Sequence, residues 1–120
     1  MSKRILVIED EADFRATLRE ILIGAGYEVD VSPYLASAVG EALSGRYDLI
    51  TLDLRMPGLD GMEIAQLFQR RRLKTPVLVI SGYLSGPITR QLSRMNIRHV
   101  LPKPSEVSEM LEAVESALTG

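Results

Sequence analysis

The chain has 120 residues, a net charge of −2 and no cysteine. This length fits one domain, residues 1–120, and the lack of cysteine excludes disulfides and thiolate metal sites. The near-neutral charge argues against nucleic-acid binding, and the short apolar run after the basic start is too short for a signal peptide or membrane helix. We therefore expect a cytoplasmic protein that binds neither nucleic acid nor membrane.

Five strand-like runs alternate with five amphipathic helical stretches. The strands are expected at 5–8, 27–32, 49–52, 77–80 and 99–102, and the helices within 14–25, 35–43, 64–68, 88–95 and 107–118. The second run alternates apolar and polar residues, which indicates an edge strand, whereas the first, third and fourth are apolar throughout. The pattern predicts an α/β, doubly wound parallel sheet of five strands in the order 2-1-3-4-5, with helices on both faces.

Polar side chains stand where four of these strands end. Glu9 and Asp10 follow the first strand, Asp53 the third, Ser81 the fourth and Lys103 the fifth. Ligands of open α/β sheets lie outside the carboxyl ends of the strands, so these groups should share one edge. Oxygen ligands suit Mg²⁺, with Asp10 and Asp53 as direct ligands and Glu9 bound directly or through water. The set predicts a site for a divalent cation and a phosphoryl group.

Each of these residues also has a structural explanation. The acids at 9–11 could favour the positive end of the next helix, Lys103 could form a simple ion pair with Asp53, and Ser81 could cap a turn. Asp53 favours the functional reading, because a carboxylate directly after a buried run needs a partner or a function.

Three other features are interpreted as structural. The single histidine, His99, is expected to be a surface or packed residue of the fifth strand. The cations of 70–72, together with Lys74, could suggest a nucleic-acid patch but are expected to complement the end of the third helix. Ser105 could cap the fifth helix.

Taken together, the site residues resemble the receiver domain of bacterial response regulators, the CheY-like superfamily, over nearly the whole chain. Glu9 and Asp10 match its acidic pair, and Asp53, in the run Asp-Leu-Arg-Met-Pro-Gly, matches its phosphoacceptor. Ser81 matches the hydroxyl residue after strand four. Lys103, followed by proline, matches a pair whose peptide bond is typically cis in the family. This family has the 2-1-3-4-5 order of the flavodoxin-like fold.

The resemblance implies a phosphorylation switch, not a turnover enzyme. A sensor histidine kinase or histidine phosphotransfer protein would donate a phosphoryl group to Asp53, beside Mg²⁺ that also uses the backbone carbonyl of Arg55. Lys103 and Ser81 would contact the phosphoryl group. The face of helix four, strand five and helix five would then signal to a downstream protein or effector domain, and the resemblance allows a homodimer on this face.

Two positions depart from the family pattern. Val100 stands where an aromatic residue is usual, and Ser105 stands where a large apolar residue is common. We also hypothesise that Tyr83, two residues after Ser81, screens the acyl phosphate from water.

Other functions can be built on the same residues. A degenerate receiver could serve only as a protein-binding platform, and the carboxylates could belong to a Mg²⁺-dependent phosphohydrolase. The strand order also suits a flavodoxin-like cofactor binder. No separate general base is evident for the hydrolase, and the acids at 9–11 would repel a cofactor phosphate.

Overall fold

In a computed structural model, which describes residues 2–32, 35–56, 59–82 and 84–119, five parallel strands form one sheet. Their order is β2-β1-β3-β6-β7, which confirms the predicted order of the five strands along the chain. The sheet strands are β1 (Arg4–Ile8), β2 (Glu28–Ser32), β3 (Leu49–Leu52), β6 (Val77–Ser81) and β7 (His99–Pro102). The helices are α1 (Ala12–Gly24), α2 (Leu35–Ala42), α3 (Gly61–Arg70), α4 (Gly86–Arg94) and α5 (Val107–Thr119).

The apolar runs become the middle of the sheet because both of their faces are covered. Residues 5–8 of β1 and all of β3 and β6 are buried, whereas β2 alternates between more and less exposed residues, as its edge position requires. Parallel pairing sets Ile8 beside Leu52 and Leu52 beside Val79. The carboxyl ends of the three inner strands therefore meet at one edge.

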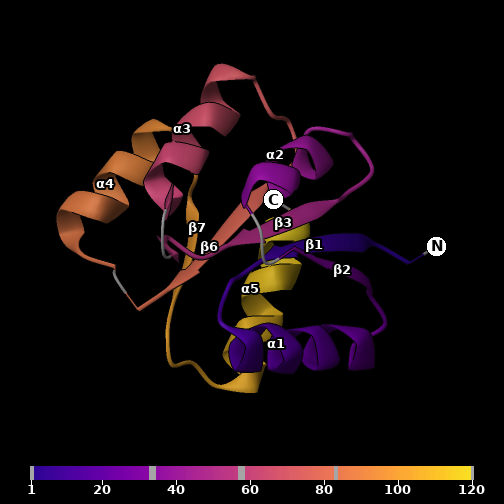
Figure 1. Cartoon of the computed structure of the whole chain (residues 1–120). Coiled ribbons are helices and arrows are strands. Elements are labelled where there is room, and N and C mark those ends of the chain that lie inside the picture. The colour runs from indigo at the N-terminus through magenta and orange to yellow at the C-terminus, as the bar shows by residue number, and fades with distance from the viewer. Residues whose placement is uncertain (1, 33–34, 57–58, 83, 120) are drawn as a thin grey trace.

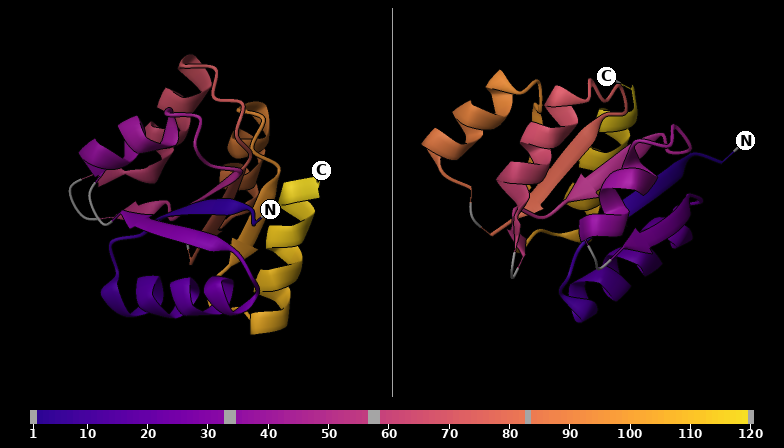
Figure 2. Two further views of the ribbon diagram at one scale, coloured as in Figure 1. Left: turned by 90° about the vertical axis from the view of Figure 1, so that its right-hand side faces the viewer. Right: turned by 45° about the horizontal axis from the view of Figure 1, so that its top comes forward.

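Two apolar cores lie on opposite faces of this sheet. One packs side chains of α2, α3 and α4 against Leu6, Ile8 and Ile50. The other packs α1 and α5 against Ile5 and Val7. Figures 1 and 2 show the same division, with α1 and α5 on one side of the sheet and the other three helices on the opposite side. Within the described residues, no helix has both the length and the apolar character needed to cross a membrane.

Three helix ends show how local residues start or stop a helix. Gly26 has a φ of 98° just after α1, a conformation that glycine adopts readily. Pro87 lies in the first turn of α4. Ser105 does not cap α5, because its hydroxyl donates to the carbonyl of Pro102. Glu109 instead accepts from the backbone N–H of Glu106 at 3.3 Å, as the reciprocal partner in a capping box does.

A short hairpin between β3 and α3 is absent from the sequence prediction. It pairs β4 (Arg55–Met56) with β5 (Leu59–Asp60) in antiparallel fashion. Two-residue strands carry too little periodicity to be found in a sequence. The hairpin returns the chain to Gly61, whose N–H donates to the carbonyl of Leu54 at 2.9 Å.

Candidate functional site

Backbone hydrogen bonds to neighbouring strands hold the predicted site residues at the carboxyl edge of the sheet. The N–H of Glu9 donates to Ser32 at 3.2 Å, and the N–H of Asp53 donates to Ile8 at 3.3 Å. The N–H of Lys103 donates to the carbonyl of Ser81 at 3.1 Å. These hydrogen bonds between neighbouring strands fix the backbone that carries the side chains, and this backbone is more rigid than a free loop.

Lys103 joins two of the three acids. Its Nζ donates to Glu9 Oε1 at 2.8 Å and to Asp53 Oδ2 at 3.1 Å. Both acids are nearly inaccessible, with 2% of Glu9 and 6% of Asp53 exposed. The simple Lys103–Asp53 ion pair considered as an alternative is therefore part of a larger cluster, and the shorter contact is to Glu9.

The acidic side chains are close enough to share a cation. One carboxylate oxygen each from Glu9, Asp10 and Asp53 lies within 4.8 Å of the other two. Oxygens on opposite sides of a Mg²⁺ ion lie about 4.2 Å apart, since each is about 2.1 Å from the metal. An all-oxygen donor set of this spread fits Mg²⁺, the ion predicted from the sequence.

Comparison with known families agrees with this geometry. The sequence profile of the response regulator receiver domain matches residues 5–115. The chain belongs to this family. It is the receiver domain of a two-component response regulator, and the family is one of signalling modules that typically bind Mg²⁺.

Two curated relatives are transcriptional regulators. The chain is 34% identical to the transcriptional regulatory protein TcrA of Mycobacterium tuberculosis over 109 residues, which cover 89% of this chain and 42% of TcrA. It is 31% identical to the transcriptional regulatory protein FixJ of Bradyrhizobium diazoefficiens over 115 residues, covering 95% of this chain and 56% of FixJ. The chain therefore spans about half the length of these relatives.

Solved structures show the same fold. Response regulator TrrA from Thermotoga maritima, described in complex with Mg²⁺-BeF, is 32% identical with a TM-score of 0.84, covering 97% of this chain and 99% of that one. Chemotaxis protein CheY4 of Vibrio cholerae has a TM-score of 0.89 at 23% identity, covering 98% of this chain and 100% of that one.

In this receiver the carboxyl of Glu9 has a shifted pKa. Burial raises the pKa of the Glu9 carboxyl from 4.5 to about 7, and the charge of Asp53 adds to the rise. The hydrogen bond from Lys103 opposes it. Without a cation, Glu9 therefore retains its proton to a higher pH than an ordinary glutamate does. A bound cation would favour its charged form.

The ammonium of Lys103 is held in its charged form. Burial alone would lower the pKa of Lys103, but its hydrogen bonds and charge interactions with Glu9 and Asp53 raise it overall. The Nζ atom also lies 4.0 Å from the centre of the Phe14 ring, within the range of a cation–π contact. Phe14 belongs to α1 and packs against the core on the α1–α5 side, and nothing in the sequence indicates this second role.

Arg15 is a residue of the site that the sequence analysis missed. Its Nη1 donates to the carbonyl of Glu9 at 3.1 Å and to that of Asp10 at 3.3 Å. A further bond runs from the N–H of Glu11 to Glu9 Oε2 at 3.1 Å. These contacts fix the loop that carries two of the three acids. Spacing alone could not reveal them, because a long arginine side chain reaches many backbone groups.

Ser81 and Arg55 lie at the ends of two strands. Ser81 is the last residue of β6 and is fully buried, and Arg55 begins β4, two residues after Asp53. Val100, at the position usually aromatic, is half-buried and packs against the core on the α2–α3–α4 side. The peptide bond between Lys103 and Pro104 is cis, as the resemblance implied. Tyr83 and residues 57–58 lie outside the described residues.

Proposed function

We propose that the whole chain, residues 1–120, is one receiver domain that accepts a phosphoryl group on Asp53. The donor would be the phosphohistidine of a sensor histidine kinase or of a histidine phosphotransfer protein. The observation that supports this most directly is the contact between Lys103 Nζ and Oδ2 of the buried Asp53, 3.1 Å apart. A half-buried lysine beside the acceptor can stabilise a phosphoryl oxygen as soon as it arrives.

The transfer forms one bond and breaks another. A carboxylate oxygen of Asp53 attacks phosphorus, the P–O bond forms, and the P–N bond to the donor imidazole breaks with its electron pair leaving on nitrogen. Lys103 then donates to a phosphoryl oxygen, and the hydroxyl of Ser81 donates to another. The chemistry is mainly positioning and charge stabilisation around an in-line transfer.

Asp10 and Asp53 would hold Mg²⁺ directly, with Glu9 bound directly or through water and the backbone carbonyl of Arg55 as a further ligand. When bound, the ion supplies positive charge that offsets the crowded carboxylates and the phosphoryl oxygens. Arg15 keeps the Glu9–Asp10 loop in place for this purpose. The fit of the acidic cluster to Mg²⁺ supports this assignment.

The face of α4, β7 and α5 is the proposed output surface. Of the nine residues of α4, only Leu92 is buried, whereas α5 buries Met110, Val114 and Ala117. An element with few buried contacts needs little free energy to shift, which suits a switch driven by one phosphoryl group. The downstream protein or effector, a homodimer on this face and the cytoplasmic location stay predictions. Hydrogen exchange before and after phosphorylation should change most in α4 if this face is the output.

The first test is the intact mass of the protein after incubation with acetyl phosphate, with and without Mg²⁺. We expect a Mg²⁺-dependent gain of one phosphoryl group, about 80 Da for a single acceptor, and no gain in Asp53→Asn. Continuing release of phosphate from a phosphate ester would favour the hydrolase instead. A wild-type protein that gains no mass from either acetyl phosphate or a phosphohistidine donor would favour a protein-binding platform.

A further inference from the structure

A second cleft lies at the end of the sheet opposite the acidic cluster. It has a volume of about 560 Å³ and is bordered by the C-terminal ends of α3, α4 and α5 and by the segments that lead into β6 and β7. Because β6 runs from Val77 at this cleft to Ser81 at the phosphorylation site, the two sites are separated by the length of a strand. A volume of this size is typical of pockets for small molecules.

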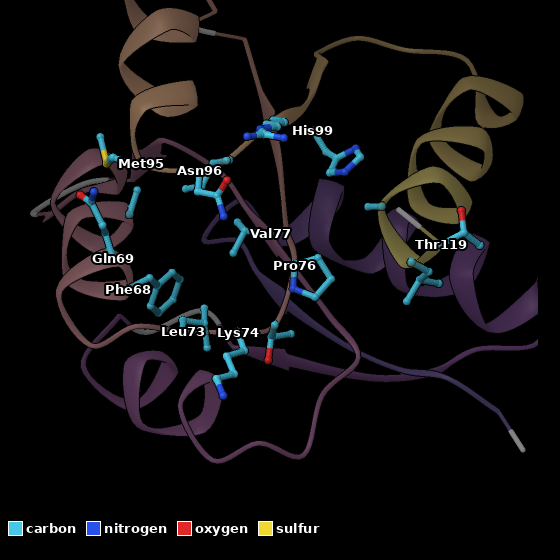
Figure 3. Close-up of a pocket in the computed structure, with 16 residues that line it drawn as sticks. Phe68, Gln69, Leu73, Lys74, Pro76, Val77, Met95, Asn96, His99 and Thr119 are labelled. Atoms are coloured by element: carbon cyan, nitrogen blue, oxygen red, sulfur yellow. The ribbon is translucent and has the colours of Figure 1, made fainter.

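The walls of the cleft are apolar in the middle and polar around it. Phe68, Val77 and Met95 are buried residues that line it. Figure 3 shows Phe68, Val77 and Asn96 around the middle of the cleft, with Lys74 and His99 on different sides of it. Such a surface suits a ligand with an apolar body and a polar or charged group.

The charged residues that line the cleft are all basic. Lys74 and Arg98 line it together with His99, and no aspartate or glutamate is among its lining residues. Both cations are exposed, and neither forms an ion pair with any residue that the structure describes. The cleft also belongs to the most basic part of the chain, since residues 64–105 contain eight of the 14 Lys and Arg and none of the 16 Asp and Glu.

The helix ends at the cleft do not account for these two cations. Arg70 and Arg94 close α3 and α4 and complement the negative ends of those helices, as was expected for the 70–72 run. Lys74 and Arg98 each come four residues later, and the effect of a helix dipole fades within its last turn. The C-terminal end of a helix is equivalent to about half a negative charge. Lys74 and Arg98 each carry a full positive charge, and Arg70 and Arg94 lie at the helix ends, so the net charge around the cleft is positive.

We propose that this cleft binds a small organic anion. Its apolar body, aromatic or aliphatic, would lie against Phe68, Val77 and Met95. Its phosphate, sulfonate or carboxylate group would be attracted by the positive charges of Lys74 and Arg98 on the wall of the cleft, with Asn96 as a hydrogen-bonding group near the middle. The site is independent of phosphorylation, because it uses none of the residues of the acidic cluster.

The test compares two probes with the same apolar body, titrated into the full chain. One is 1-anilinonaphthalene-8-sulfonate, which is anionic, and the other is N-phenyl-1-naphthylamine, which lacks the sulfonate. We expect the anionic probe to saturate one site and to bind at least about tenfold more tightly, a ratio equal to one full charge contact of about 1.4 kcal/mol. Amide chemical shifts of Leu73, Asn96 and Ile97 should move during the titration.

Two double variants with the same change in charge make the comparison specific. Lys74→Gln with Arg98→Gln should weaken the anionic probe about tenfold, whereas Arg19→Gln with Arg90→Gln should leave it within about twofold, because Arg19 and Arg90 are exposed residues that do not line the cleft. Equal losses in the two variants, or equal affinity for the two probes, would overturn the proposal. Asp53→Asn should bind the probe normally. Loss there would place the probe in the phosphorylation site and would also overturn the proposal.

Discussion

Lys103 balances the charge of the buried acids at the proposed phosphorylation site. Its ammonium lies 2.8 Å from Glu9 and 3.1 Å from Asp53, both nearly closed to water. Removing one member of a buried cluster of charges leaves the other charges uncompensated. The free-energy cost of this change exceeds the free energy that the cluster contributed when it formed. Lys103 is therefore the residue whose loss should separate metal binding from phosphoryl transfer.

In Lys103→Met, phosphorylation by acetyl phosphate should slow about 100-fold, the usual cost of removing one donor to a developing negative charge. Mg²⁺ affinity should stay the same or rise, because the ion no longer shares the carboxylates with an ammonium. A mass-spectrometric time course measures the first and calorimetry the second. Lys74→Met, on the surface at the far end of the sheet, is the matched control. If Lys103→Met is phosphorylated at the wild-type rate, Lys103 does not take part in phosphoryl transfer.

Glu9 gives the metal-free protein a pH dependence of stability. Its pKa is about 7 in the folded state and 4.5 ordinarily, so the folded state binds the extra proton between these values. Glu9 therefore contributes stability that is fully present below about pH 4.5 and is lost as the pH rises through about 7. Urea unfolding without Mg²⁺ at pH 5 and pH 8 should show a smaller difference in Glu9→Gln than in wild type. Glu112→Gln, exposed on α5, should keep the wild-type difference; equal differences in all three would contradict the assignment.

At the scale of elements, the approach of α3 to the end of β3 is the tightest constraint on Asp53. A Cβ at Gly61 would lie 2.4 Å from Leu54 Cα and 2.7 Å from the carbonyl oxygen of Asp53. Neither backbone atom can move without moving Asp53. Glycine is thus required at the start of α3 by packing and not by an unusual φ.

Gly61→Ala should lower the free energy of unfolding by about 1–3 kcal/mol, the usual cost of overpacking, and should slow phosphorylation of Asp53. Gly40→Ala adds the same methyl group inside α2, where the new Cβ meets nothing within 4 Å. That control should stabilise the protein by about 0.4–1 kcal/mol and leave phosphorylation unchanged. Chemical denaturation and the mass time course measure both. If Gly61→Ala and Gly40→Ala have the same free energy of unfolding, the close approach of α3 to the end of β3 would be wrong.

The sequence predicted helices and strands wherever a long pattern of apolar residues marks them. It did not predict individual contacts between side chains and backbone. The apolar runs ending at Ile8 and Leu52, with the alternating run between them, determine the strand order, and the strand order brings Glu9 and Asp53 to one edge. The β4–β5 hairpin, the contacts made by Arg15 and the capping contact at Glu106 before α5 escaped prediction. Each depends on a few hydrogen bonds whose geometry is set only when the helices have packed.

On the scale of the whole molecule, one sheet separates two cores and carries groups of opposite charge at its two ends. The carboxyl edge gathers acids around Lys103, and the opposite edge gathers cations around Lys74 and Arg98. A cation and an anion are therefore expected at opposite ends of the strands. The free energy of unfolding should rise when the cation binds, because a ligand that binds only the folded state stabilises the whole domain.

Mg²⁺ at 100 times its dissociation constant should raise the free energy of unfolding by about 2.7 kcal/mol, and a chelator should remove the gain. Asp10→Asn should lose most of this response because it deletes a proposed ligand. Asp13→Asn changes an exposed acid in the first turn of α1 and should respond as wild type does. Thermal unfolding with and without Mg²⁺ measures the difference. A full response in Asp10→Asn would place the ion elsewhere.

The central claim is that Asp53 is the acceptor, and chemical trapping tests it most directly. Borohydride reduces an acyl phosphate to an alcohol, so phosphorylated protein treated with it should carry homoserine in place of aspartate at one position. Fragment masses should place that change at Asp53, only in samples that contained Mg²⁺ and a phosphoryl donor. Homoserine at Asp10 or Asp60 instead, or phosphorylated protein with no reduced residue, would contradict the account.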